Sequence, residues 1–350
     1  MSLLKIENVK LKGVSVCVPS MVEENRDYPY YEPGEYDRIL PTIGIERRHV
    51  LKKGQTSADL SLKAAEKLLS DLGWEKDSIG LLVYCSPARD YILPDTACLI
   101  QNRLGLPQST MAFDMTLGCT GWTYGLTTVC SILQNGSIKR ALLLNGNMGS
   151  SENSYTDKTA YPVAGDIGSA TAFEFDQTST PIWCELGTDG QKSIIIPDGG
   201  RRNPITENSL KQNEIDKGVI RSNIHIEMDW MNVFSFDLKK APISLGAVLD
   251  FASVKIENID CFLFQQSNYF AVKKIIRKLK LPEEKAPLCL RSFGTTGASC
   301  IPLIMVSELS EKLRNNTNKV VACSFGVGFS WASIYLITSD IVVSDLQVLD

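Results

Sequence analysis

Histidine is scarce in this chain, whose 350 residues contain only His49 and His225. A histidine general base therefore has two candidates at most. A clustered basic excess is also lacking, because the formal net charge is −4, and this argues against nucleic-acid binding as the main function. No apolar run approaches the roughly 18 residues of a membrane-spanning helix. Membrane insertion is therefore not expected.

The ten cysteines include no C-x-x-C pair. Most of them lie within apolar runs, as Cys85, Cys261 and Cys323 do. Buried free thiols in a reducing compartment explain this pattern. The N-terminus carries the charged residues Lys5 and Glu7, which interrupt the apolar core that a secretory signal needs. We therefore expect a cytoplasmic protein.

Strand and helix patterns alternate along the chain, which is typical of an α/β fold. The alternation occurs twice. In the first half a strand pattern at 79–84 is followed by a helical stretch ending at 104–107, a short strand pattern at 111–114 and the turn GCTG at 118–121. In the second half the matching parts are 259–264, a helix over about 268–281, the apolar triplet 288–290 and GTTGA at 294–298.

Each of the two blocks ends in a further strand pattern and a glycine-containing turn, at 141–146 and at 320–326. This self-similarity predicts two related α/β units, residues 1–178 with the nucleophile and residues 179–350. The boundary falls in the polar segment 176–181, which is rich in residues that break regular structure. An alternative is that any two strand-helix-strand stretches look alike.

Cys119 differs from the other cysteines because glycines lie on both sides of it, an apolar strand leads in and a helical pattern leads out. A thiol at a helix N-terminus faces free amide hydrogens, which favour the thiolate by up to roughly 1 kcal/mol. Glycines let a substrate carbonyl approach closely. These features favour a nucleophile, and on the residues alone a small core residue is an equal alternative.

Four segments in order along the chain resemble the ketoacyl synthase III family of the thiolase superfamily. Residues 114–125, DMTLGCTGWTYG, are similar to its nucleophile segment, and 44–49, GIERRH, match its early signature. Residues 165–170, GDIGSA, resemble a Gly-Asp-Gly-Ala-Gly-Ala turn with departures at 167–169, and 325–331, FGVGFSW, resemble its Phe-Gly-Gly-Gly-Phe-x-Trp loop. The resemblance covers nearly the full length of the chain.

This resemblance implies a thiolase-like, five-layered αβαβα fold made of two fused related halves, usually as a homodimer. It also implies that an acyl thioester transfers its acyl group to Cys119. The backbone amides of Cys119 and Val327 would then hold the oxyanion. Val327 stands where the family has glycine, so the geometry of this turn is expected to differ. The residue at the Leu93 position closes the acyl pocket of the partner subunit in the family, and apolar Leu93 suits that role.

Two members of the family's Cys-His-Asn triad are replaced. The segment that matches His-Gln-Ala-Asn is QQSN at 265–268, and the one that matches Gly-Asn-Thr-Ser is GTTG at 294–297. Gln265 and Thr295 therefore occupy the positions of histidine and asparagine. Both can donate a hydrogen bond to a thioester carbonyl, but neither accepts a proton usefully near neutral pH. The catalytic set implied by the resemblance is Cys119 with Gln265 and Thr295.

No general base can be assigned from the sequence. We expect His49 and His225 to be structural, the latter in a strand-like stretch at 223–226. Asp90, Asp157 and Asp166 are acids that could come near the thiol, although surface ion pairs and turn caps are commoner roles for such residues.

The substrate entrance also departs from the family. Where the family grips coenzyme A with a tryptophan and two arginines, this chain has Arg38, Thr42 and Lys158. A basic helical face at 273–280, KKIIRKLK, follows the second-half site segment. Its members Lys273, Lys274 and Arg277 could dock an acidic acyl carrier protein, and a solvated charged surface is an equal alternative. No metal and no tightly bound cofactor are expected.

Three functions are compatible with these residues. The first is an acyltransferase that loads Cys119 from an acyl carrier protein or CoA thioester and passes the acyl group to a small-molecule hydroxyl or amine, without decarboxylation. The second is decarboxylative condensation to a 3-oxoacyl thioester, of the fatty acid or polyketide type. The third is a catalytically silent partner of an active homologue. Retention of the nucleophile with loss of the histidine and asparagine favours the first.

Overall fold

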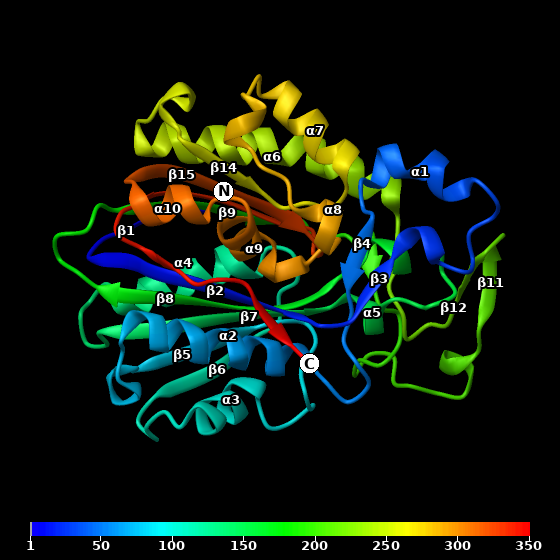
Figure 1. The fold of residues 1–350 in the computed structure, drawn as a ribbon, viewed down its shortest axis with the longest axis horizontal. Helices are drawn as coiled ribbons and strands as arrows, with labels where there is room; N and C mark the ends of the chain where they lie inside the picture. The colour runs from blue at the N-terminus through cyan, green and yellow to red at the C-terminus, as the bar shows by residue number, and fades with distance from the viewer. Residues whose placement is uncertain (1) are drawn as a thin grey trace.

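Two β-sheets form the centre of the molecule in the computed structural model, which describes residues 2–350 (Figure 1). A seven-stranded sheet has the order β17-β2-β8-β7-β5-β6, with β18 also paired to β2, and a five-stranded sheet has the order β1-β9-β16-β15-β14. The first contains β2 (Val9–Pro19), β5 (Leu81–Cys85), β6 (Met111–Met115), β7 (Arg140–Met148), β8 (Asp166–Phe175), β17 (Val342–Val343) and β18 (Gln347–Leu349). The second contains β1 (Ser2–Ile6), β9 (Ile182–Thr188), β14 (Cys261–Phe264), β15 (Asn318–Gly326) and β16 (Ser330–Thr338).

Helices cover both outer faces of the sheets and fill the space between them. α2 (Ser57–Leu72) and α3 (Thr96–Leu104) pack on the seven-stranded sheet, and α6 (Trp230–Ala252) and α7 (Tyr269–Lys278) cover the five-stranded sheet. α4 (Gly121–Leu133) and α9 (Cys300–Ser307) lie between the two sheets, in an apolar core that both sheets share. The layers therefore follow the order αβαβα, as Figure 1 shows from bottom to top. This confirms the thiolase-like, five-layered fold expected from the sequence.

Local sequence explains where these helices start and how they pack. α2 begins with a capping box between Thr56 and Asp59 and ends at Gly73, whose φ of 60° suits glycine. α7 begins at Asn268, whose side chain accepts a hydrogen bond from the backbone N–H of Ala271 at 2.8 Å. α4 and α9 are apolar on nearly all sides because a sheet lies on each side of them.

The strands at the two ends of the chain each join the sheet formed mainly by the other half. β1 pairs with β9 in the five-stranded sheet, whereas β17 and β18 pair with β2 in the seven-stranded sheet. The triplet 288–290 forms no strand in the described part of the chain, because α8 (Leu290–Phe293) begins there. The five-stranded sheet therefore ends at β14 and has no strand that corresponds to β6.

Smaller elements gather at one end of the sheets, on the right in Figure 1. They include α1 (Glu35–Ile43), α5 (Gly149–Glu152) and three two-stranded ribbons: β3 (Val22–Glu24) with β4 (Arg47–His49), β10 (Ile194–Ile195) with β13 (Glu227–Met228), and β11 (Asn213–Asp216) with β12 (Val219–Arg221). α10 (Ser310–Asn315) follows α9. Short 3-10 turns are η1 (Asn25–Asp27), η2 (Lys76–Ser78), η3 (Tyr161–Val163), η4 (Asn208–Leu210), η5 (Ile256–Asn258), η6 (Glu283–Lys285) and η7 (Gly297–Ser299). Among the described residues, none of the helices combines the length and apolar character of a membrane span.

Candidate active site

Cys119 lies in the turn that connects β6 to α4, directly before Thr120, the N-cap of α4. The end of this turn and the first turn of α4 are held across the interior. The side chains of Thr120 and Ser330 share a hydrogen bond of 2.7 Å, and those of Thr123 and Ser324 share one of 2.6 Å. The start of α4 is thereby fixed to β15 and β16, and Cys119 remains partly exposed.

The turn after β15 approaches Cys119 so closely that only glycine fits at position 326. A Cβ on Gly326 would lie 2.6 Å from Cβ and 2.7 Å from Sγ of Cys119. The backbone N–H groups of Val327 and of Cys119 itself both lower the pKa of the thiol by hydrogen bonding. The two amides implied for the oxyanion hole therefore face the position of the sulfur.

Burial nevertheless dominates the ionisation of Cys119. It raises the pKa of the thiol to about 11, and the nearby charges of Asp237 and Glu152 add to the increase against the two amides. The sequence led us to expect that the helix N-terminus would favour the thiolate. In the structure, desolvation outweighs that effect. The thiol is therefore protonated near neutral pH, and its reaction needs a proton acceptor.

Gln265 and Thr295 both line the cavity of Cys119. Gln265 follows β14 and is buried. With its amide nitrogen turned toward the backbone carbonyls beside it, Gln265 donates hydrogen bonds to the carbonyl oxygens of Cys119 at 3.3 Å and of Gly297 at 3.2 Å. Its donors thus support the nucleophile turn. The backbone N–H of Thr295 donates to the carbonyl of Val163 at 2.8 Å.

The cavity has a volume of about 320 Å³, at the lower end of ligand pockets. Most of its wall is apolar. The apolar lining comes from the β10–β13 ribbon, the start of α6 and the end of β15, and comprises Ile194, Ile195, Ile196, Ile226, Met228, Trp230, Val233 and Phe325, with Pro87, Ala160, Val163, Ala164 and Val327. Such a wall suits an acyl chain.

Two acids line this cavity that the sequence did not indicate. Glu152 ends α5, and burial together with the charge of Asp166 raises its pKa to about 7. Asp237 lies in α6, and burial raises its pKa to about 8 against one hydrogen bond from Ser267. A lone acid inside the apolar stretch 233–238 is the signal that could have drawn attention to Asp237. Within residues 2–350, no lysine, arginine or histidine lines the cavity.

The three acids considered from the sequence do not line the cavity in the described chain. Asp166 accepts hydrogen bonds from the backbone N–H of Leu51 at 2.7 Å and of Ser150 at 2.9 Å. Asp157 forms an ion pair with Arg221 at 3.0 Å. The backbone N–H of Asp90 donates to the Thr96 side chain. Asp157 and Asp166 are therefore structural anchors.

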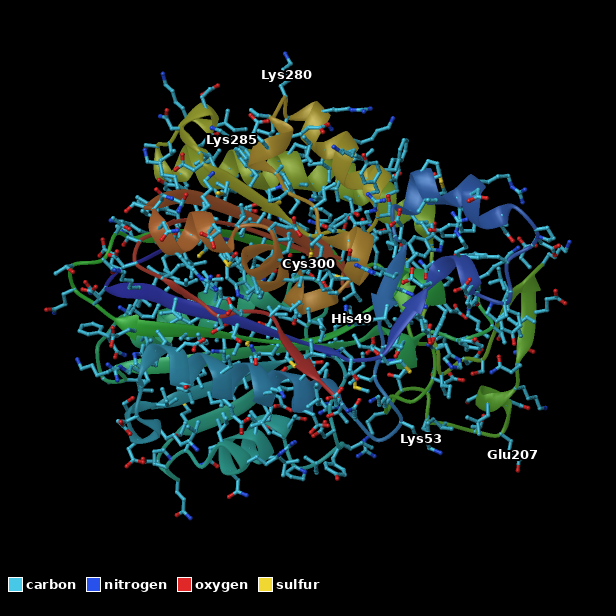
Figure 2. All side chains as sticks on the ribbon, viewed as in Figure 1. His49, Lys53, Glu207, Lys280, Lys285 and Cys300 are labelled. Atoms are coloured by element: carbon cyan, nitrogen blue, oxygen red, sulfur yellow. The ribbon has the colours of Figure 1, made fainter. Side chains whose placement is uncertain are left out.

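Both histidines also have structural surroundings outside the cavity. His49 stacks on Phe293 and its Nδ1 lies 2.7 Å from the Pro19 carbonyl oxygen, near the centre of the view in Figure 2. Nδ1 of His225 lies 2.9 Å from the Ser222 hydroxyl. Burial lowers the pKa of each. The strand expected at 223–226 is absent from the described residues, since this segment forms a turn that precedes β13.

The predicted docking residues lie on α7. Lys273 forms an ion pair with Glu283 at 2.5 Å, and the ammonium group of Lys274 lies 4.9 Å from the centre of the Phe270 ring. Lys274 and Arg277 are exposed, whereas Lys273 is half-buried. The surface therefore offers free cations at two of the three positions.

The residues that the resemblance assigns to the substrate entrance and to the partner's acyl pocket do not line the cavity of Cys119. Lys158 is engaged in an ion pair with Glu35 at 2.8 Å. Leu93 is 78% exposed and follows the exposed residues Tyr91 and Ile92. It does not line the cavity of its own chain. An apolar loop of this kind on the surface is typical of an interaction site.

A partly exposed cysteine before a helix N-terminus, two amides beside its sulfur and an apolar cavity within an αβαβα fold define an acyl-transferring condensing enzyme of the thiolase fold. The family model for 3-oxoacyl-[acyl-carrier-protein] synthase III matches residues 113–190, and the model for the C-terminal part of that protein matches 249–337. The chain belongs to the 3-oxoacyl-[acyl-carrier-protein] synthase III family.

Individual relatives support this assignment over the full length. A β-ketoacyl-[acyl-carrier-protein] synthase III from Koribacter versatilis is 29% identical over 331 residues, covering 93% of this chain and 96% of the relative. The crystal structure of a 3-oxoacyl-(acyl-carrier protein) synthase from Burkholderia xenovorans superposes with a TM-score of 0.93 at 32% identity, covering 99% of each chain. OleA from Xanthomonas campestris, at 18% identity, shares the fold with a TM-score of 0.78 over 96% of this chain and 98% of its own.

Proposed function

We propose that this protein forms an acyl-enzyme on Cys119 from an acyl carrier protein or CoA thioester and passes the acyl group to a small-molecule hydroxyl or amine without decarboxylation. One observation carries this proposal. Cys119 shares its cavity with two carboxyl groups, Glu152 and Asp237, and with no basic side chain of the described chain. Two carboxyl groups without a basic partner can remove a proton from an attacking nucleophile, but they provide no cation to bind an anionic second substrate such as a malonyl thioester.

In the first half-reaction, Sγ of Cys119 attacks the carbonyl carbon of the donor thioester. The thiol proton passes to a carboxylate of the cavity, and the amides of Cys119 and Val327 stabilise the negative charge on the carbonyl oxygen. The carbon–sulfur bond of the donor then breaks. The departing thiolate takes up the proton, which leaves an acyl group on Cys119 and a free carrier thiol.

Decarboxylative condensation is the second candidate. It would place the carboxylate of a malonyl thioester in a largely apolar cavity where no basic side chain of the described residues can pair with it. Gln265 also has its amide hydrogens directed to two backbone carbonyls, so the donor role expected from its position requires a rearrangement. Both points favour simple transfer over condensation.

We also propose an acyl carrier protein as the donor and a homodimer as the working form. The exposed cations Lys274 and Arg277 support docking of an acidic carrier. Exposed Leu93 supports contact with a second copy of the chain, where it would close the acyl pocket. All ten thiols are free and eight of them are buried, which is compatible with a reducing cytoplasm.

The experiment is intact-protein mass spectrometry after incubation with acyl carrier protein and CoA thioesters of different chain lengths. We expect a mass increase of one acyl group that disappears in Cys119→Ala and persists in Cys98→Ala, a control that removes an exposed thiol. Unchanged mass across the whole panel would exclude acyl transfer and favour the silent-partner alternative. Release of carbon dioxide from malonyl carrier protein would instead establish condensation.

A further inference from the structure

Asp237 is the most deeply buried acid at the cavity. It is 1% exposed and lines the same space as Cys119. Its Oδ2 accepts a hydrogen bond from the Ser267 hydroxyl at 3.1 Å. Its Oδ1 has no hydrogen-bond partner among the described residues. A buried carboxyl oxygen without a partner is costly, so folding alone does not explain this residue.

The surroundings of Asp237 are those of an apolar core. Phe236, Ala241 and Leu245 of the same helix are buried in the cluster that joins α6 to the five-stranded sheet. An apolar side chain at position 237 would continue that surface without an unpaired polar atom. A strongly perturbed acid in a cleft beside a nucleophile is instead typical of a functional site.

Glu152 is the other carboxyl group of the cavity and differs from Asp237 in its setting. Its side chain is half-buried, and burial together with the charge of Asp166 raises its pKa. The charge of Asp237 also acts more strongly on the Cys119 thiol than that of Glu152 does. Asp237 is therefore the carboxyl group better placed for chemistry at the acyl carbon.

We propose that Asp237 is the general base of the second half-reaction and that the acceptor is a primary amine. This inference rests on the proposed acyl transfer through Cys119. No basic side chain of the described residues lines the cavity, so an ammonium group is what would stabilise the carboxylate form of Asp237, whereas a neutral alcohol would leave the carboxyl protonated and unable to act as a base. The pKa of Asp237, about 8, lies close to the pH at which a base of this kind works well.

The proposed step conserves atoms and charge. The acceptor enters as an ammonium ion and pairs with the carboxylate of Asp237, which removes one proton. The neutral amine nitrogen attacks the acyl carbon on Cys119, a carbon–nitrogen bond forms and the carbon–sulfur bond breaks. The second nitrogen proton passes to the sulfur. The products are an amide and the free thiol, and Asp237 releases its proton to solvent.

The test is a single-turnover measurement on acyl-enzyme prepared beforehand. Wild type, Asp237→Asn, Glu152→Gln and the control Asp250→Asn are mixed with propylamine or with propanol, and loss of the acyl mass is followed. Asp250 is an exposed acid on the same helix. We expect Asp237→Asn to form the acyl-enzyme within about tenfold of the wild-type rate, and to lose at least about 100-fold in transfer to propylamine. Asp250→Asn should match wild type in both steps.

The pH profile separates a base from a structural residue. Wild-type transfer to propylamine should rise with pH and level off above about 8, the pKa of Asp237. In Asp237→Asn the slow rate should keep rising toward the pKa of the free amine, about 10. If Asp237→Asn does not fold, the wild-type profile still decides the question, because a rate that levels off near pH 8 supports Asp237 and one that keeps rising toward the pKa of the amine overturns it.

Three results would overturn the inference: unchanged transfer in Asp237→Asn, loss of transfer in Glu152→Gln alone, or propanol reacting as fast as propylamine. These failures are distinct from failure of the proposed function. In that case wild type would form no acyl-enzyme at all, and the assignment of Asp237 would fall with it.

Discussion

Asp237→Asn should stabilise the protein, and the gain should depend on pH. Below about pH 4 the Asp237 carboxyl is protonated in both the native and the unfolded states. Between pH 4 and 8 the unfolded carboxyl is ionised while the native one, with a pKa of about 8, keeps its proton. The native state then binds more protons, so native stability falls as pH rises. Above pH 8 this loss of native stability is complete. Asparagine avoids the loss because its side chain does not ionise.

The size of the effect follows from the raised pKa. A pKa of about 8 against the ordinary 3.8 corresponds to at most about 6 kcal/mol at about 1.4 kcal/mol per tenfold change. Relaxation and water in the cavity reduce this figure, and we expect about 3 kcal/mol at pH 8.5. With an unfolding entropy of about 2 cal/mol/K per residue, Tm should rise by about 4 °C. At pH 4.5 the difference should nearly vanish.

The assay is thermal unfolding of wild type and Asp237→Asn at several pH values and one protein concentration, because dimerisation would make Tm depend on concentration. Asp250→Asn is the control for loss of a charge on α6. The pH dependence that Glu152 contributes is the same in both proteins and cancels. A Tm difference that stays constant from pH 4.5 to 8.5, or a less stable variant at pH 8.5, would refute the burial argument.

Three further outcomes are expected. Iodoacetamide at pH 9 should alkylate Cys119 at least about threefold faster in Asp237→Asn than in wild type, because removal of a nearby negative charge lowers the pKa of the thiol. An equal rate would place Asp237 too far away to influence the ionisation of Cys119. Gly326→Ala should slow acylation by about 100-fold or more with little loss of secondary structure by circular dichroism, since its Cβ would displace the Cys119 side chain. Lys274→Glu should raise KM for acyl carrier protein thioesters by about threefold to tenfold and leave KM for CoA thioesters unaffected. The control is Lys53→Glu, which should change neither KM. Figure 2 shows Lys53 on the side of the molecule away from Lys280, a residue just after the end of α7. An equal response of both thioesters would argue against docking on this face.

The proposal of Cys119 as the nucleophile could be made from the sequence because its signal is local. Glycines on both sides of Cys119, a strand before it and a helix after it lie within one short stretch. The resemblance to the family also predicts that Gln265 and Thr295 occupy the positions of its histidine and asparagine. Periodicity predicted two related α/β halves, since sheets covered by helices require alternating strand and helix patterns, whereas the five layers were implied by the resemblance to the family.

The acids of the cavity could not be found in this way. Asp166 and Asp157 stand in segments near familiar motifs, yet both are used up by hydrogen bonds and ion pairs that hold loops in place. Glu152 and Asp237 come from two different halves of the chain and meet Cys119 only when α5 and α6 pack around the ends of β14 and β15. How strongly the thiol holds its proton could not be predicted either, because burial is a property of the packed molecule.

The sequence by itself determined the fold class and the family and predicted the nucleophile, because the motifs that carry the resemblance follow one another in order along the chain. Tertiary structure alone decided which carboxyl groups reach the sulfur, whether the glutamine amide is free, and how strongly the thiol holds its proton. These properties depend on distance and desolvation across the interior, and neither is set by residues that are neighbours along the chain.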